Sequence, residues 1–392
     1  MNRRRRRPNY FGWAILILVL AFGYYFDQVY ITQIDNPFEP TPTPTRAPES
    51  FVTEAEALFT EGKLLPAIDA YQQAINASPQ DPSLYVALAR VQVFAGLFEE
   101  AQKNAENALL LNQNNALAYG VHAWALDFQE GKNAQALESI RNALELDPNN
   151  ALIHAYHVEV LITSGFDNYA KAAEESRVAL ALNPDIVETR RARALILEAT
   201  GNYEEAIAEY QAAIDINPNI PFLHIGLGLN YRILQVYDKA VEAFTRANAL
   251  NPADPLPDLY ISRTYATIGE YAKSLQYAEA SVQDRPDSAS LRGNLGVMYY
   301  RNFLWPEAIQ QLGYTIYGGL TEDGVEIEGI PLVNDPLVAE YYFTYGLALA
   351  RTNQCGEALP TAQMIQSRVP SDENAIFAAD EIIRICSENL AG

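Results

Sequence analysis

The longest uninterrupted apolar stretch of the chain lies close to its N-terminus. Five consecutive arginines, residues 3–7, precede it, and no charged residue occurs between Arg7 and Asp27. As a helix, these 19 uncharged residues would be about 28 Å long, which matches the hydrocarbon core of a bilayer. The pattern therefore predicts a transmembrane helix over residues 11–30, after a basic segment over residues 1–10.

Aromatic and charged residues around this helix predict its orientation. Trp13 lies near one end and Tyr24 near the other, as is typical of the two membrane interfaces. Because clustered arginines stay in the cytoplasm, we expect a single-pass cell-membrane protein with a cytoplasmic N-terminus and extracytoplasmic repeats. A cleaved signal peptide is the alternative, since residues 21–23 have a small-x-small form. A buried core helix would not explain the five arginines.

The segment after this helix, residues 31–47, is rich in proline and threonine. The two alternate from Pro40 to Pro44, which blocks both helix and sheet and favours an extended, polyproline-like chain. We interpret the segment as a stalk that holds the following domain away from the membrane.

From residue 48 onward, one pattern of glycine, aromatic, alanine and proline positions recurs. In its clearest copy, Gly201 is followed by Tyr203, Ala206, Ala213 and Pro218. The small residue at the place of Ala206 returns every 34 to 36 residues, as Ala67, Ala101, Ala136, Ala172, Ala206, Ala240, Ser274 and Ala308. The pattern resembles the tetratricopeptide repeat, a helix-turn-helix unit of about 34 residues.

This resemblance covers residues 48–372 and implies an all-α fold. About nine repeats are expected to stack into a right-handed superhelical solenoid with one continuous core. The small marker residues let two helices approach closely, and the proline ends the second helix of each repeat. Residues 373–392 are expected to form a C-terminal capping helix.

An insertion interrupts the late repeats. The step from Ala308 to its next equivalent, Ala358, is 50 residues, which is 16 more than one repeat. The additional residues lie near 317–338. Within them, residues 325–327 alternate between apolar and polar and are bracketed by glycines, which favours a short hairpin or an ordered loop. A passive surface loop is the alternative.

The composition excludes several classes of function. The chain has 27 basic and 49 acidic residues, for a net charge of −22, and five of the basic residues belong to the N-terminal run. A body this acidic should repel nucleic acid, so no nucleic-acid partner is expected. Two cysteines exclude a disulfide-rich scaffold and a Cys₄ zinc module, and four histidines leave few options for a histidine-rich catalytic metal site.

The sequence contains no motif for a reaction or a cofactor. We find no phosphate-binding glycine loop, nucleophile elbow or metalloprotease motif. His154 and His157 lie three residues apart, but polar packing between helices explains them better than a metal does. Gly228 takes a small-residue position of the repeat, so packing explains it. We expect a protein that is not an enzyme and has no catalytic residue, cofactor or metal.

Arginine is concentrated in the first helices of the expected repeats, whereas lysine falls in turns and second helices. In proteins of the family that the chain resembles, the first helices line the concave groove, so the arginines there would suit carboxylates or an acidic peptide. The expected groove residues are Arg90, Trp124, Arg191, Arg232, Arg263, Tyr300, Arg301 and Arg351. The alternative is that these arginines neutralise glutamates within the solenoid.

The repeat frame also places the two cysteines. Cys355 falls at the start of the last second helix, and Cys386 falls near the end of the helix after it. In such solenoids these points meet at one edge of the last layer, so a disulfide between them is expected in an oxidising exterior. It would close 31 residues and stabilise the fold by about 3 to 4 kcal/mol in the chain-entropy model. Two separately buried thiols are the alternative.

The predicted function is binding. We expect a bacterial envelope protein that acts as a membrane-anchored, extracytoplasmic scaffold or adaptor for a protein or peptide partner, of acidic character. The alternative is an accessory factor for the export of envelope polysaccharide or protein. The repeats alone do not select between these two, because one fold serves many functions.

Overall fold

The computed structural model describes residues 10–29 and 46–391, and the chain divides into two units, residues 1–47 and residues 48–392. In the first unit, α1 (Tyr10–Val29) is a helix of 20 residues with exposed apolar side chains. Within the described residues, no helix is both long and apolar enough to cross a membrane. The predicted transmembrane helix therefore stays a prediction. The basic run and most of the predicted stalk lie outside the described residues.

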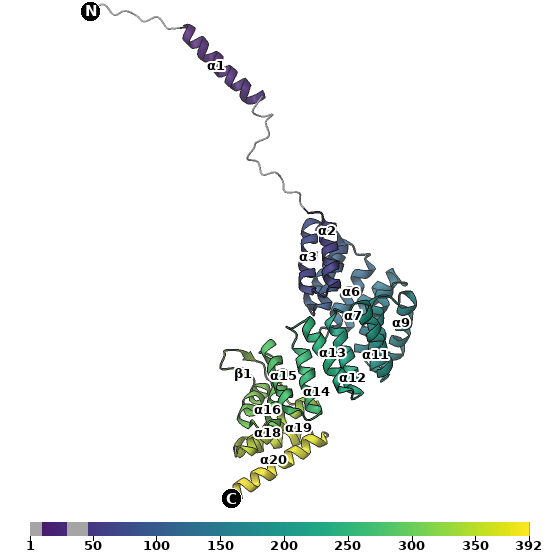
Figure 1. The fold of residues 1–392 in the computed structure, drawn as a ribbon, viewed down its shortest axis with the longest axis vertical. Helices are drawn as coiled ribbons and strands as arrows, with labels where there is room; N and C mark the ends of the chain where they lie inside the picture. The colour runs from purple at the N-terminus through teal and green to yellow at the C-terminus, as the bar shows by residue number, and fades with distance from the viewer. Residues whose placement is uncertain (1–9, 30–45, 392) are drawn as a thin grey trace, which may run out of the picture. The chain divides into compact units, whose positions relative to one another are not determined.

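The second unit is a solenoid of paired antiparallel helices (Figure 1). Its nine pairs are α2 (Pro48–Thr60) with α3 (Leu64–Ala77), α4 (Pro82–Phe94) with α5 (Phe98–Leu111), α6 (Ala116–Asp127) with α7 (Asn133–Leu146), α8 (Ala151–Thr163) with α9 (Tyr169–Leu182), α10 (Val187–Ala199) with α11 (Tyr203–Ile216), α12 (Pro221–Ile233) with α13 (Tyr237–Leu250), α14 (Pro255–Thr267) with α15 (Tyr271–Asp284), α16 (Ala289–Arg301) with α17 (Trp305–Tyr317), and α18 (Pro336–Arg351) with α19 (Cys355–Arg368). A last helix, α20 (Glu373–Ala391), packs on α18 and α19.

Local chemistry explains where the first helix begins in six of the nine repeats. In several repeats an Asp, Asn or Ser side chain accepts a hydrogen bond from a backbone N–H of the first turn, which would otherwise lack a partner. These capping residues are Asp81, Asn115, Asn150, Asp254, Ser288 and Asp335. Proline follows directly in α4, α14 and α18, where its fixed φ suits the first helical position.

The small marker residues of the repeats are all fully buried between the helices of their pairs, from Ala67 to Ala308 and at Ala358. In two repeats the large residue one turn further on faces a glycine of the paired first helix, Phe244 facing Gly228 and Leu312 facing Gly296. Phe244 fills the space next to Gly228, and a Cβ on that glycine would lie 2.5 Å from the ring. Volume is thus conserved across the pair, as dense packing requires.

Not every turn between paired helices uses the expected glycine. Gly62 and Gly201 adopt a positive φ there, as the sequence predicts. In three later repeats the same left-handed position is held by Gln235, Phe303 and Asn353, with φ of 61° to 63°. The tight turn is therefore imposed by the packing of the two helices, and glycine is only its easiest occupant.

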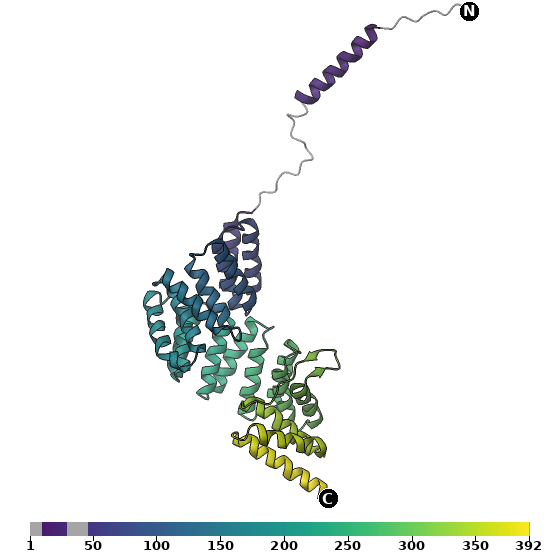
Figure 2. The same ribbon diagram turned by 180° about the vertical axis from the view of Figure 1, so that it is seen from behind.

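The insertion is ordered and contains a short antiparallel hairpin, as one of the two predictions had it. Strand β1 (Gly319–Leu320) pairs with β2 (Glu326–Ile327). The Ile330 N–H donates to the carbonyl of Thr315 at 2.8 Å, and the Tyr342 hydroxyl donates to the carbonyl of Ile330 at 2.8 Å. These bonds fasten the insertion to α17 and α18, at one edge of the solenoid (Figure 2).

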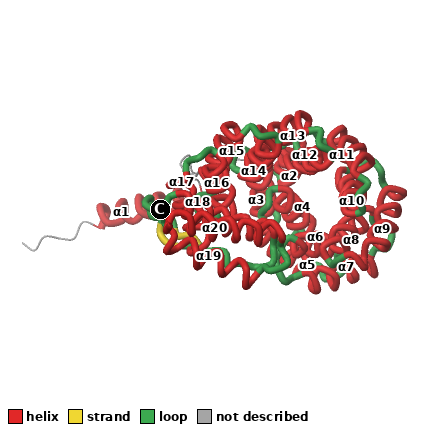
Figure 3. Tube along the Cα trace, turned by 90° about the horizontal axis from the view of Figure 1, so that it is seen from below, coloured by secondary structure: helices red, strands yellow, loops and turns green. Residues whose placement is uncertain are grey.

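The first six repeats bend until the chain meets itself again (Figure 3). The side-chain amide of Asn219, just before α12, donates to the carbonyl of Thr60 at the end of α2, at 3.1 Å. The position of Gly62 is so close to Asn219 that a Cβ there would lie 2.5 Å from its carbonyl oxygen. The beginning of the solenoid and its middle are therefore in direct contact.

Candidate functional site

Two of the predicted groove arginines lie in ion pairs inside the first half of the solenoid. The Arg90 Nε of α4 donates to Oε1 of Glu188 in α10 at 2.5 Å. Arg191 donates to Glu159 in α8, whose other oxygen accepts from the Trp124 indole N–H at 2.8 Å. Burial alone would lower the pKa of Arg90, but the charge of Glu188 opposes this and raises the pKa above its ordinary value. Here the prediction that arginines neutralise internal glutamates is the one that fits.

Aromatic rings fill the space between these ion pairs. The rings of Phe94 and Phe222 stack with their centroids 5.3 Å apart, and the Arg191 guanidinium carbon lies 4.5 Å from the centroid of Phe222. Trp124 stacks on Tyr156 at 4.6 Å. These residues come from α4, α6, α8, α10 and α12, so the inner face of the first half is closed by its own side chains.

Two of the expected groove residues are buried by this packing. Trp124 has none of its surface exposed and Arg191 only 8%. Neither side chain lies on a surface that a partner could reach. Sequence reasoning assigned both to the groove because they lie in first helices, but it could not show that distant repeats pack against them.

The same region holds a carboxyl with an unusual pKa. Burial raises the pKa of Asp127 to about 7, although a hydrogen bond from the Thr163 hydroxyl acts in the opposite direction. Asp127 lies at the end of α6, beside the end of α8, and its bond to Thr163 links the two helices. We read it as a structural group of the solenoid.

Two of the histidines, His154 and His157, lie beside one glutamate, Glu175. His154 has Nδ1 2.6 Å from Oε2 of Glu175 and Nε2 3.0 Å from the carbonyl of Pro148, so both ring nitrogens donate and the ring is protonated. The hydrogen bond to Glu175 raises the pKa of His154. Burial would raise the pKa of Glu175, but the hydrogen bond with His154 and the nearby His157 ring, 3.3 Å away, lower it to about 2. In residues 10–29 and 46–391, no group of three or more His, Cys, Asp or Glu is arranged to hold a metal ion.

The second half of the solenoid, from the end of α12 to α20, differs from the first half, because two hollows open on its inner face. Arg232 of α12, Arg263 of α14 and Arg301 of α16 line one hollow of about 310 Å³, together with Asn294 and Tyr341. We call this the arginine hollow. Burial, followed by the charge of Arg263, lowers the pKa of Arg232. Three of the predicted groove residues are therefore brought together on one surface.

A larger and more apolar hollow of about 660 Å³ adjoins the arginine hollow, and the two share Arg301, Leu337 and Glu340. We call this larger hollow the phenylalanine hollow. Its apolar wall comes from α18 and α20 and is formed by Pro336, Leu337, Phe343, Leu347, Phe377 and Ala378. Phe377 keeps 75% of its surface exposed. Sequence reasoning missed this wall, although a large apolar residue at a polar position of α20 could have indicated it.

The remaining predicted groove residues lie elsewhere. Tyr300 is half-buried in α16 and lines neither hollow. Arg351 ends α18, with its guanidinium 4.0 Å from Glu381. The two cysteines form a disulfide between the start of α19 and the end of α20, with their Cα atoms 5.5 Å apart. This bond holds α20, and with it one wall of the phenylalanine hollow.

Known proteins support the repeat assignment. Family models described as TPR repeat or tetratricopeptide repeat match residues 116–150, 194–232 and 259–322. A chain of the crystal structure of the APC/C hetero-tetramer Cut9–Hcn1 superposes with a TM-score of 0.66 over 85% of this chain and 63% of that chain, at 15% identity. At that identity the likeness shows the fold alone, and it spans less than two thirds of that chain.

Two further structures are similar over shorter parts. A thermophilic TPR protein of Thermus thermophilus is 26% identical, with a TM-score of 0.40 over 47% of this chain and 98% of its own. A tetratricopeptide repeat protein of Parabacteroides merdae is 17% identical, with a TM-score of 0.43 over 64% and 98%. No curated protein matches the chain. The second unit is thus a solenoid of nine helix pairs, in which tetratricopeptide repeat models match three stretches and whose fold is similar to that of the superposed chain.

Proposed function

We propose that the protein is a scaffold that binds a protein partner on the inner face of its second half, in the two adjoining hollows between α12 and α20. One observation carries this proposal. The first half fills its inner face with its own side chains, whereas the second half leaves a large apolar side chain, Phe377, exposed in a hollow. Exposed apolar surface in a concave site is typical of binding surfaces. The proposed role is binding, without a reaction.

A selection from random peptides tests the proposal and does not require the partner to be identified. Random 12-residue peptides displayed on phage would be selected on the full chain in detergent micelles. We expect the selected peptides to lose at least about tenfold in affinity for Phe377→Asp, because a charge in the apolar hollow must be desolvated by the ligand. Affinity would be measured by fluorescence anisotropy.

Phe166→Asp is the matched control. Phe166 is 82% exposed, and it lies in the short 3₁₀ turn η2 (Phe166–Asn168) before α9, away from both hollows. Its replacement should leave binding unchanged. A selection that yields no binder, or binders that treat Phe377→Asp like the wild type, would remove the proposal.

We further propose that the N-terminal segment anchors the scaffold in a membrane, with the repeats outside the cytoplasm. The proposal rests on the arginine run at residues 3–7 and the uncharged stretch up to Phe26. A reporter that is active only outside the cytoplasm, fused after Gly392, should be active. Replacement of all five arginines by Asn should weaken or invert the orientation. An active reporter of this kind on the Met1 side of the wild type would contradict the proposal.

A further inference from the structure

We infer that the partner segment carries a carboxylate next to a large apolar side chain, with the carboxylate bound by Arg232 and Arg263 and the apolar side chain placed in the phenylalanine hollow. This inference rests on the proposed function and adds the chemistry of the ligand and its direction along the groove.

Arg232 and Arg263 lack an acidic partner in the part of the chain that the structure describes. Among the described residues, no carboxylate lies within ion-pair distance of Arg232 or Arg263. Five other first-helix arginines have one, whereas Arg193 and Arg292 donate to uncharged oxygens of Ser176, Pro286 and Gln311. The pairs are Arg90 with Glu188, Arg190 with Glu209, Arg191 with Glu159, Arg301 with Glu340, and Arg351 with Glu381. In a chain with 49 acidic and 27 basic residues, Arg232 and Arg263 are thus two neighbouring cations without an acidic partner within the described ranges.

Holding these two positive charges close together costs electrostatic free energy. Arg232 and Arg263 are both half-buried on neighbouring first helices, and the charge of Arg263 adds to burial in lowering the pKa of Arg232. Like charges in a partly desolvated place repel each other. An anion that binds between them removes this repulsion and gains charge-assisted hydrogen bonds from both guanidinium groups.

Other polar groups of the arginine hollow already have partners. The Tyr341 hydroxyl donates to the carbonyl of Ser290 at 3.1 Å, and the Asn294 amide donates to Ser262 Oγ at 3.1 Å. Glu340 lies 3.7 Å from Arg301. The charged donors that lack an acid among the described residues are those of Arg232 and Arg263, and Arg263 also hydrogen-bonds to the Tyr341 hydroxyl. Val297 and Met298 lie beside them, and apolar side chains strengthen an ion pair by excluding water.

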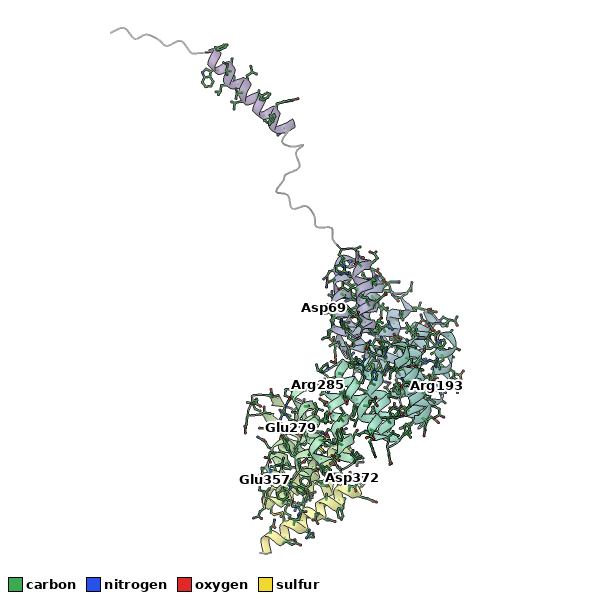
Figure 4. The ribbon with its side chains drawn as sticks, viewed as in Figure 1. Asp69, Arg193, Glu279, Arg285, Glu357 and Asp372 are labelled. Carbon is green, nitrogen blue, oxygen red and sulfur yellow. A yellow bond between two sulfur atoms is a disulfide. The ribbon has the colours of Figure 1, made fainter. Side chains whose placement is uncertain are left out.

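The neighbouring phenylalanine hollow offers an apolar surface. Its acidic residues have partners on the chain itself, since Asp372 (labelled in Figure 4) caps α20 through the Ala375 N–H and Glu381 is bonded to Arg384. They therefore do not require a cationic ligand. The surface offered to a partner is apolar, and it begins where the arginine hollow ends. An extended segment would thus place its acid and its apolar side chain a few residues apart.

The selection described above also tests this inference. We expect the selected peptides to be enriched in Asp or Glu within about five residues of Phe, Leu, Ile or Met. Their affinity should fall about 10- to 100-fold in R232E/R263E, because each lost contact is a charge-assisted hydrogen bond that becomes a repulsion. Replacing the acids of a selected peptide by Lys should restore its binding to R232E/R263E. R141E/R177E is the control, with two exposed arginines on second helices, and should bind like the wild type.

The outcomes separate the two proposals. If selected peptides lose affinity for Phe377→Asp but show no acidic enrichment and bind R232E/R263E normally, the proposed function stands and this inference is wrong. If no binder is selected, or none depends on Phe377, both are wrong. Circular dichroism establishes whether the variants fold. If R232E/R263E does not fold, R232Q/R263Q replaces it, because this variant removes the two charges without reversing them. Restored binding by the Lys-substituted peptide cannot come from a folding defect and would establish the carboxylate contact.

Discussion

Arg90 and Glu188 form an ion pair at 2.5 Å although 98 residues separate them in the chain. The pair joins the second repeat to the fifth across the inside of the solenoid. Glu188 has no exposed surface, and its second oxygen has no hydrogen-bond partner among the described residues. The closed inner face of the first half therefore depends strongly on this contact.

We predict that Arg90→Ala lowers the free energy of unfolding by about 3 kcal/mol, because it leaves a buried carboxylate without its counter-charge. Urea denaturation followed by circular dichroism measures this. Arg177→Ala, which removes an exposed i,i+3 pair with Glu174, should cost no more than about 0.5 kcal/mol. Equal effects of the two substitutions on the free energy of unfolding would show that the Arg90–Glu188 contact does not hold the second and fifth repeats together.

Asp127 should make stability depend on pH. Because burial raises its pKa to about 7, the folded state binds a proton that the unfolded state, with a pKa near 3.8, has lost. The stabilisation is complete at acidic pH and is lost as the pH rises through about 7. We expect the wild type to lose about 2 kcal/mol more than Asp127→Asn between pH 5 and pH 8. The amide still accepts the bond from Thr163.

Unfolding curves at several pH values would measure this difference. Other groups titrate alike in wild type and variant, since the raised pKa of His154 gives stabilisation that is lost as pH rises and the lowered pKa of His122 and of His224 gives the reverse. The difference between the two curves therefore reports on Asp127. Identical slopes for wild type and variant would mean that Asp127 is ionised throughout.

The Cys355–Cys386 disulfide should stabilise the last repeat. The bond closes 31 residues, so Cys355→Ser with Cys386→Ser should cost about 3 kcal/mol. Hydrogen exchange should then rise chiefly in α20, because a terminal helix has a neighbour on one side only. Intact mass after alkylation without reductant tests the bond itself. Two alkylated cysteines in protein taken directly from cells would contradict it.

Gly228→Ala should destabilise the protein by about 1 to 3 kcal/mol, although alanine is the better helix former. A Cβ at this position would lie 2.5 Å from the ring of Phe244, which is fully buried and has no room to move away. Gly356→Ala in α19 is the control, since no atom lies within 4 Å of its added Cβ. That substitution should be neutral or stabilising by up to about 1 kcal/mol. Thermal melting of both variants decides the matter.

The sequence by itself determined the helix pairs and their stacking. Small residues such as Ala206, returning every 34 to 36 positions, are a local signal, because each repeat packs only on its neighbours and so needs the same residues at the same places. The insertion near 317–338 was equally visible as a change of spacing. The hairpin was one of two open predictions there, since two-residue strands carry little pattern.

Only the tertiary structure decided which part of the groove is open. Arg191 and Arg232 look alike in sequence, because both lie in first helices, yet one is buried against Glu159 and the other faces a hollow without an acid. The difference arises from how sharply the solenoid bends, which sums small rotations over many repeats. Repeats one to six bend until Asn219 meets Thr60, and contacts at that distance along the chain leave no mark in a 34-residue pattern.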